Sequence, residues 1–338
     1  MSNNRLIFKT STSDEVYYFK DSIFIKFFNK RNTLSTSVLN GGIHNDLNFV
    51  FNHHLSQDNI DYLENHNLND YLINLCSNYN FNPLKSTGLV TLALMKNLSI
   101  VTMMYKKLDV TAITTAGVRV NAVCAGDDAS YYEENGEFNF GTINTILLIN
   151  SKLDDNVLVE AFMVASEAKS VALNNLKIPS QFSNNFATGT GTDGLVIASN
   201  LDSDNSITNA GKHSKLGELI GKSIVESIHV AIKKQVWITA SSQSNVLVLL
   251  NRYKLNINEF YDSLNQEKHS FISQLKIDSK IQENIAVTSS ILNLIDDVEK
   301  GILKKDNAYK LANSFLQYCR GDTVNYLLAF WIEKFLQN

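Results

Sequence analysis

Four segments rich in glycine and threonine carry the residues best suited to chemistry. Glycine lets the backbone approach a ligand closely and leaves amide N–H groups available as donors. The threonine hydroxyl both donates and accepts hydrogen bonds. Loops of this kind, if they meet at one edge of a sheet, suit a ligand that is rich in amides and partly anionic, although each loop alone is more often an ordinary tight turn. The segments are 114–118 continuing to 125–127, 141–144, 187–193 and 210–221.

Asp193 and His213 are the first candidates for catalysis within these loops. Asp193 closes the Gly-Thr run, and His213 lies where a helix is predicted to begin. An Asp–His pair can activate water or a hydroxyl group, and Thr188, Thr190 or Ser214 would supply that hydroxyl. The alternatives are a turn or cap role for Asp193 and a surface position at the helix start for His213.

Glu167 and Lys169 lie in a predicted helix among small neighbours. Glu167 could be a general base, and Lys169 could neutralise negative charge that develops on a substrate. Residues two apart do not share a helix face, so the two are not expected to act as a direct pair. For Lys169 we favour a solvated surface charge, and for Glu218 with Lys222 an ordinary helical salt bridge.

Two further patterns carry less weight. The run 217–223 reads G-x-x-x-G-K-S, one residue short of the phosphate-binding loop, and falls inside a predicted helix, which argues against nucleotide hydrolysis. His44, His53 and His54 lie near Asp46 but lack the spacing of a metal site. We therefore expect neither a bound metal nor another protein-bound cofactor.

The composition describes a globular chain with a large core. Its 338 residues are 44% hydrophobic and 19% charged, with a formal net charge of -4. This balance gives no reason to expect nucleic acid or an anionic membrane as a partner. The cysteines form no CxxC pair, the N-terminus lacks the apolar core of a signal peptide, and no apolar stretch is long enough to span a membrane. The sequence therefore predicts a cytoplasmic protein, and its oligomeric state stays open.

The chain begins with β-structure. Short runs of β-branched and aromatic residues at 6–8, 16–19, 23–28 and 35–39 are separated by Ser, Thr and Asp, which are typical of turns. Their spacing predicts a meander of antiparallel strands. The region 58–79 has instead the apolar periodicity of a helix.

From residue 86 the chain alternates predicted helices and strands. Some of these strands are almost continuously apolar, as expected when both faces are covered. The pattern predicts helices packed on a central mixed sheet, so the fold class is α/β or α+β, and the strand order stays open. The helices are expected at 86–96, 154–176 and 212–234, and the strands at 110–115, 142–150 and 194–200.

After about residue 240 the strand signals fade and helical periodicity dominates. We interpret this part as a helical C-terminal extension. The predicted domains are thus a catalytic α/β domain of residues 1–238 and an extension of residues 239–338. Its helices are expected at 246–252, 257–264, 291–299 and 308–336.

The loop segments, taken together and in order, resemble the adenosylcobinamide amidohydrolase family. The resemblance spans roughly residues 35–234 and is only loose after residue 240. No single piece is decisive, but the ordered set is hard to obtain by accident. The matching segments are 37–42, 115–118, 125–127, 141–144, 167–169, 187–193 and 211–221.

The resemblance implies a specific reaction. Such enzymes hydrolyse the amide that joins a propionyl arm of the corrin ring to 1-amino-2-propanol. The product, adenosylcobyric acid, re-enters cobalamin biosynthesis, so the reaction is a salvage step. The implied partner is a small-molecule corrinoid, and its cobalt belongs to the substrate rather than to a protein metal site.

Amide hydrolysis needs an activated nucleophile, an oxyanion stabiliser and an acid for the departing amine. For the implied reaction we assign catalysis to Asp193, His213 and Glu167, with backbone amides of the loop glycines as the oxyanion hole. Other residues of the segments are assigned to substrate binding. These are Asn40, Gly41, Thr115, Gly117, Asp127, Thr142, Asn144, Lys169, Thr188, Thr190 and Thr192.

Two other functions stay open at this point. One is a corrinoid-binding protein that has kept the pocket but lost catalysis. The other is a self-processing amidase, in which Thr190 or Thr192 becomes an N-terminal nucleophile after chain cleavage. Product formation distinguishes an enzyme from the first alternative, and the intact mass of the chain tests the second.

Overall fold

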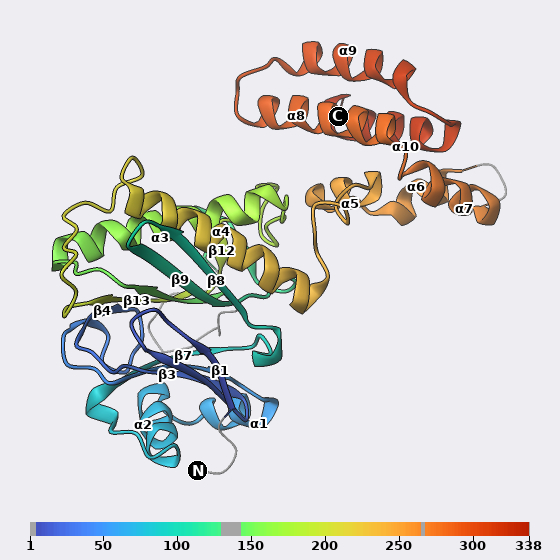
Figure 1. Cartoon of the computed structure of the whole chain (residues 1–338). Helices are drawn as coiled ribbons and strands as arrows, with labels where there is room; N and C mark the ends of the chain where they lie inside the picture. Colours follow the sequence, from blue (N-terminus) through green and yellow to red (C-terminus); the bar gives the residue numbers. More distant parts are fainter. Residues whose placement is uncertain (1–4, 130–142, 265–267, 338) are drawn as a thin grey trace. The chain divides into compact units, whose positions relative to one another are not determined.

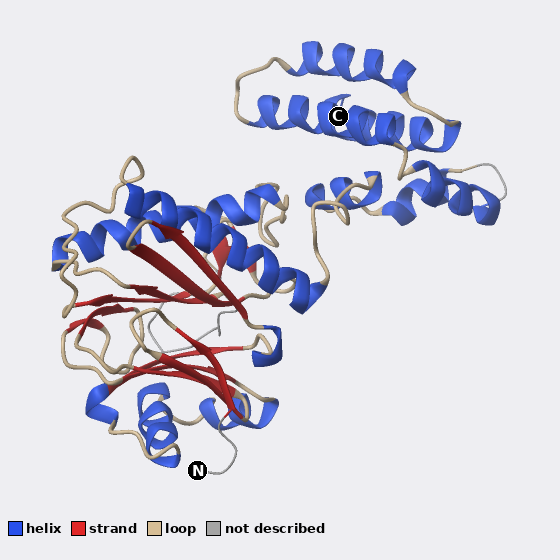
Figure 2. Ribbon diagram, in the orientation of Figure 1, coloured by secondary structure: helices blue, strands red, loops and turns tan. Residues whose placement is uncertain are grey.

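The computed structural model describes residues 5–129, 143–264 and 268–337 (Figure 1). The chain divides into two compact units. Within the described ranges, the first unit contains all the strands and the second is helical (Figure 2). The first unit consists of Met1–Phe182 and Phe186–Thr239, and the second of Ser183–Asn185 and Ala240–Asn338.

The first unit is built of four layers in the order helix, sheet, sheet and helix (Figure 2). The two sheets pack face to face around an apolar core that includes Ile25, Val50, Ile113 and Val196. The outer face of each sheet is covered by helices, with a separate apolar core beneath them. Covering both faces explains why several strands are apolar without alternation. The structure confirms the predicted α/β class.

The first sheet consists, in spatial order, of β1 (Arg5–Lys9), β2 (Glu15–Phe19), β3 (Ser22–Lys26), β6 (Phe49–His54) and β7 (Ser86–Thr91). Its first three strands form the antiparallel meander that the sequence predicts. β6 is antiparallel to β3 and parallel to β7. The parallel pair requires a crossover connection.

That connection contains the helices α1 (Gln57–Leu63) and α2 (Leu68–Asn78). Ser56 caps the first helix and Asn67 the second, each through a side-chain oxygen that accepts a backbone N–H. The helical region predicted at 58–79 is confirmed, with a break between the two helices. α2 packs its apolar face on the first sheet.

The predicted helix at 86–96 is wrong. Ser86–Thr91 is the buried strand β7, followed by a short 3-10 turn at Met95–Asn97. Gly88 lies directly against the ring of Phe51 in β6, because a Cβ atom at this glycine would come within 2.1 Å of the ring. Pairing with a distant strand thus outweighs the local Ser/Thr cap signal.

The second sheet is mixed, as predicted. In spatial order its strands are β5 (Gly42–His44), β4 (Arg31–Ser35), β13 (Gly194–Asn200), β11 (Asn144–Ile149), β9 (Leu108–Thr115) and β8 (Ser99–Tyr105). β11 and β13 are parallel, and the other neighbours are antiparallel. The strand predicted at 35–39 as the fourth of the meander is wrong: the strand there is β4, which ends at Ser35 and belongs to the second sheet, because β6 takes the position beside β3.

The outer face of the second sheet is covered by α3 (Asp155–Asn175) and α4 (Lys215–Val236), close to the predicted bounds. Ser214 caps α4 by accepting the backbone N–H of Gly217. Gly217 is required there, because a Cβ atom would lie 2.3 Å from the carbonyl oxygen of Gly211.

The second unit is helical, as predicted. Its helices are α5 (Val246–Leu250), α6 (Ile257–Ser263), α7 (Lys268–Asp278), α8 (Gln282–Glu299), α9 (Lys305–Phe315) and α10 (Asp322–Ile332). They enclose a core around Trp331. The stretch predicted at 308–336 is divided between α9 and α10, where Gly321 takes a positive φ of 81°. No helix in the described ranges is long and apolar enough to cross a membrane.

His53 of β6 is buried, and both of its ring nitrogens have hydrogen-bond partners. Nδ1 lies 2.7 Å from the Ser22 hydroxyl, and Nε2 lies 2.8 Å from the Tyr71 hydroxyl. Burial lowers the pKa of His53 from 6.5 to about 4, because the charged form loses its solvation. The unfolded chain therefore takes up this proton at higher pH than the folded chain, and stability falls as the pH falls through this window.

We expect the free energy of unfolding to decrease from pH 6.5 to pH 4, by at most about 1.4 kcal/mol per pH unit for this single group. His53→Gln cannot titrate and should flatten this part of the profile. His66 is exposed, so His66→Gln is the control and should leave the slope as in the wild type. Urea unfolding at several pH values measures the effect, and an equal slope in wild type and His53→Gln would contradict it.

Candidate functional site

Loops from three of the glycine- and threonine-rich segments meet where the central strands of the second sheet end. Asn144, at the start of β11, lies in register between Thr115, at the end of β9, and Gly194, at the start of β13. The loop before β13 contains β12 (Gly189–Thr190), which pairs with β10 (Ala122–Val123). Polar loops therefore meet at one place on the sheet.

A cavity of about 260 Å³ opens at these strand ends, and we name it the sheet-edge cavity. Its walls come from the loop after β4, from β7, from α2 and from the loop before β13. Leu68 and Leu72 of α2 form part of its apolar side. Its polar side is formed by Thr36, Ser37, Asn144, Thr192 and Asp193, with Gly194 beside them.

Three donors hold the Asp193 carboxylate at this cavity. Oδ1 accepts the Thr190 hydroxyl at 2.6 Å, and the Thr190 backbone N–H lies 3.1 Å from each carboxylate oxygen. Lys169 of α3 forms an ion pair with Oδ2. Together these four contacts engage both carboxylate oxygens.

Lys169 is not a solvated surface charge, so that interpretation is wrong. Its side chain is 23% exposed, and its partner Asp193 is 15% exposed. Glu167, two residues earlier on α3, has a different partner, as the helix geometry predicts. The sequence could not reveal the ion pair, because it depends on how α3 lies against the loop before β13.

Gly189 leaves the space that the ion pair occupies. A Cβ atom at Gly189 would lie 2.2 Å from Asp193 Oδ2 and 3.0 Å from Lys169 Nζ. A Cβ atom at Gly191, in the same loop, would have nothing within 4 Å. The pair therefore requires only the first of these two glycines.

Asn144 belongs to a buried network of amide side chains. Its Nδ2 donates to Asn52 Oδ1 at 2.9 Å and to the Val90 carbonyl at 2.8 Å. Asn52 in turn donates to Thr115 Oγ1 at 2.9 Å. Thr115 is itself buried, so it supports the network. Asn52 is absent from the predicted site, because a single Asn in a buried strand gives no signal before the two sheets are packed together.

The three threonines of the loop before β13 have different environments. Thr188 Oγ1 accepts the backbone N–H of Ala125 at 2.8 Å and so ties this loop to the one after β10. Thr190 holds Asp193, as described above. Thr192 lines the sheet-edge cavity, and its buried hydroxyl has no hydrogen-bond partner among the described residues. An unpaired buried hydroxyl is a position where a ligand could bind.

Asn40 and Gly41 shape the loop after β4. Asn40 donates to the carbonyl oxygens of Pro83 and Ser86, both at 2.7 Å. A Cβ atom at Gly41 would lie 2.2 Å from the carbonyl oxygen of Ser37. Both residues therefore hold the loop in place, and neither is among the residues that line the sheet-edge cavity.

Three other residues assigned to substrate binding are Gly117, Asp127 and Thr142. Asp127 accepts the backbone N–H of Cys124 at 2.8 Å and the Ser180 hydroxyl at 2.5 Å, so it organises the loop after β10. Gly117 is buried just beyond the end of β9. Thr142 lies outside the described residues.

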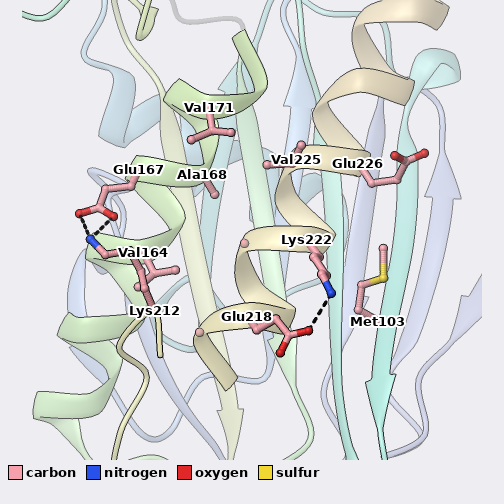
Figure 3. Close-up of a pocket in the computed structure, with 12 residues that line it drawn as sticks. Met103, Val164, Glu167, Ala168, Val171, Lys212, Glu218, Lys222, Val225 and Glu226 are labelled. Atoms are coloured by element: carbon pink, nitrogen blue, oxygen red, sulfur yellow. Dashed lines mark hydrogen bonds and ion pairs between the residues drawn. The ribbon is translucent and has the colours of Figure 1, made fainter. Parts of the chain in front are cut away.

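Glu167 and His213 do not line the sheet-edge cavity. Glu167 pairs with Lys212, whose Nζ lies 2.8 and 2.6 Å from its carboxylate oxygens, and it lines a second cavity of about 510 Å³ between α3 and α4 (Figure 3). Figure 3 also shows the predicted helical salt bridge between Glu218 and Lys222. His213 is exposed and has no hydrogen bond within the described ranges. The structure therefore does not join the three residues assigned to catalysis.

No group of three or more His, Cys, Asp or Glu side chains in the described part of the chain is arranged to hold a metal ion. Of the residues considered for a metal site, His53 is engaged with Ser22 and Tyr71. Asp46 forms an ion pair with Lys85. These partners explain both residues as parts of the fold.

Fold and site together define a mixed-sheet α/β domain with a polar cavity at one edge of the sheet. The family model described as adenosylcobinamide amidohydrolase (CbiZ) matches residues 7–240. The match covers more than half of the chain, so the protein belongs to the adenosylcobinamide amidohydrolase family. The resemblance found across 35–234 is confirmed and extends further in both directions.

The chain is also similar to an uncharacterized protein of Methanocaldococcus jannaschii. The two are 35% identical over 166 residues, which is 45% of this chain and 63% of the relative. The chain therefore spans less than two thirds of that protein's length. No activity is assigned to that relative, so this likeness leaves the reaction to be tested.

Proposed function

We propose that the chain hydrolyses the aminopropanol amide of adenosylcobinamide to adenosylcobyric acid and 1-amino-2-propanol in cobalamin salvage. Membership of the family supports the reaction. The observation that carries the site is the Asp193 carboxylate at the sheet-edge cavity, fixed by Thr190 and Lys169. The cobalt ion is part of the substrate.

In this mechanism Asp193 is the general base. Its carboxylate takes a proton from a water molecule bound beside it as the water oxygen attacks the amide carbon. Thr190 fixes the carboxylate beforehand, so little reorganisation is needed during the reaction. The C–N bond then breaks and the proton passes to the departing amine. The products are a carboxylate and an alkylammonium ion.

Lys169 supplies positive charge beside the reacting amide. Attack by water places negative charge on the amide oxygen, and a partly buried cation stabilises that charge more strongly than one in bulk water. Before the attack, Asp193 balances the lysine charge. Once Asp193 has taken up the proton, Lys169 loses this counter-ion and is available to the oxyanion.

Incubation with adenosylcobinamide is expected to release adenosylcobyric acid and 1-amino-2-propanol in equal amounts. Mass spectrometry of the corrinoid and of the derivatised amine measures the two products. The Asp193→Asn variant is the control and should bind the corrinoid with little turnover. A change in corrin absorbance without product, even at stoichiometric protein, would indicate a corrinoid-binding protein and contradict the proposal.

A further inference from the structure

The amide of Asn144 has a fixed orientation and one open acceptor. Both of its N–H groups are used, one by the side chain of Asn52 and one by the carbonyl of Val90. A carbonyl can only accept, so Nδ2 must face Val90 and Oδ1 must point elsewhere. Oδ1 has no hydrogen-bond partner in the described ranges, although Asn144 is only 1% exposed.

Gly194 keeps this acceptor open to the sheet-edge cavity. A Cβ atom at Gly194 would lie 2.5 Å from Asn144 Oδ1, and both residues line the cavity. No described residue donates a hydrogen bond to this oxygen, so it is available to a donor from outside the chain. Oδ1 is therefore a position at which a donor group of a ligand would be favourable.

Two other polar groups of the cavity can accept hydrogen bonds as well. The Thr192 hydroxyl is buried and unpaired within the part of the chain that the structure describes. Asp193 is a carboxylate, which can only accept hydrogen bonds. Among the described residues that line the cavity there is no Lys, Arg or His. The cavity therefore suits a neutral or positively charged group with donors and disfavours a carboxylate or phosphate.

The size and the apolar surface of the cavity restrict the class of ligand further. At about 260 Å³, the cavity is smaller than sites for whole drug-sized molecules, which measure about 300–1,000 Å³. It cannot enclose a corrin ring. Val38, Leu68 and Leu72 provide an apolar side that suits a short alkyl group. A small amino alcohol combines such an alkyl chain with N–H and O–H donors.

We propose that the sheet-edge cavity is the subsite for the amine that leaves during hydrolysis, and that it recognises a short amino alcohol. The N–H of the amide, or of the ammonium after cleavage, donates to Asn144 Oδ1. The alcohol hydroxyl pairs with Thr192, and Asp193 then lies beside the bond that breaks. This inference rests on the proposed function, because it assigns one half of that substrate to one part of the site.

Isothermal titration with free 1-amino-2-propanol tests the subsite without turnover. The buffer should be phosphate, because Tris is itself an amino alcohol. We expect saturable binding of 1-amino-2-propanol, weaker binding of 1,2-propanediol, which lacks the amine, and no binding of lactate, which carries a carboxylate. Equal affinity for all three compounds, or no binding of the amine, would overturn the inference.

Thr192→Val removes the hydroxyl and keeps the shape of the side chain. Because this hydroxyl has no protein partner among the described residues, the variant should fold normally. Its affinity for 1-amino-2-propanol should fall by about tenfold, as expected for one lost hydrogen bond. Glu218→Gln, in the second cavity, is the control and should keep wild-type affinity. Unchanged affinity in Thr192→Val would overturn the assigned contact.

Binding and turnover together separate this inference from the proposed function. If adenosylcobinamide is hydrolysed but the free amine neither binds nor inhibits, the subsite is wrong and the hydrolysis stands. If the amine binds with the expected selectivity but adenosylcobinamide is not hydrolysed, the subsite is supported and the hydrolysis is wrong.

Discussion

Replacing Asp193 with Asn is expected to lower kcat for adenosylcobinamide by about 10²–10⁴-fold, the range typical of a general acid–base group. The amide cannot take a proton from water. It also meets two groups that can only donate to it here, the Lys169 ammonium and the Thr190 backbone N–H. KM should change much less than kcat, because the corrinoid contacts are kept. Steady-state kinetics with detection of the released amine measures both constants.

The controls for this prediction come from the residues that the structure places elsewhere. His213→Ala and Glu167→Gln should keep kcat close to the wild-type value, because His213 is exposed and Glu167 pairs with Lys212. Thermal melting must show that Asp193→Asn is folded. A folded Asp193→Asn enzyme with normal kcat would make this carboxylate structural. A severe loss of kcat in His213→Ala would return the histidine to the mechanism.

The local sequence pattern correctly predicts those helices and strands whose own residues determine whether they are buried. β11 and β13 have uninterrupted apolar centres and lie in the interior of the second sheet, so their pattern and their environment agree. α3 begins directly after Asp154, the residue whose type favours that position. The Gly-Thr loop before β13 is likewise marked by composition alone.

Elements and contacts that depend on distant partners could not be predicted in this way. β7 is a strand because it pairs with β6 and because Gly88 fits against Phe51. The ion pair of Lys169 with Asp193 joins a helix to a loop 24 residues later. The expected pairing of Asp193 with His213 failed to form for the same reason, since residue type does not determine which loop faces which helix.

Gly189→Ala is expected to lower kcat by about 10²-fold or more, as loss of a positioned charged group does. The added methyl carbon would lie 2.2 Å from Asp193 Oδ2, so the carboxylate must leave its place between Thr190 and Lys169. Gly191→Ala is the matched control from the same loop. It meets nothing within 4 Å, so its kcat should be normal and its stability slightly increased, by about 0.4–1 kcal/mol.

A double-mutant cycle decides whether the methyl group acts through the carboxylate. If it does, Gly189→Ala should have little further effect on kcat in the Asp193→Asn background, because the group that it displaces has already lost its function. If it acts through the backbone of β12, the two losses should instead multiply. The same comparison with Gly191→Ala should show no coupling, since that position contacts neither partner of the ion pair. Multiplying losses for the first pair would therefore remove Asp193 as the reason why residue 189 must be glycine.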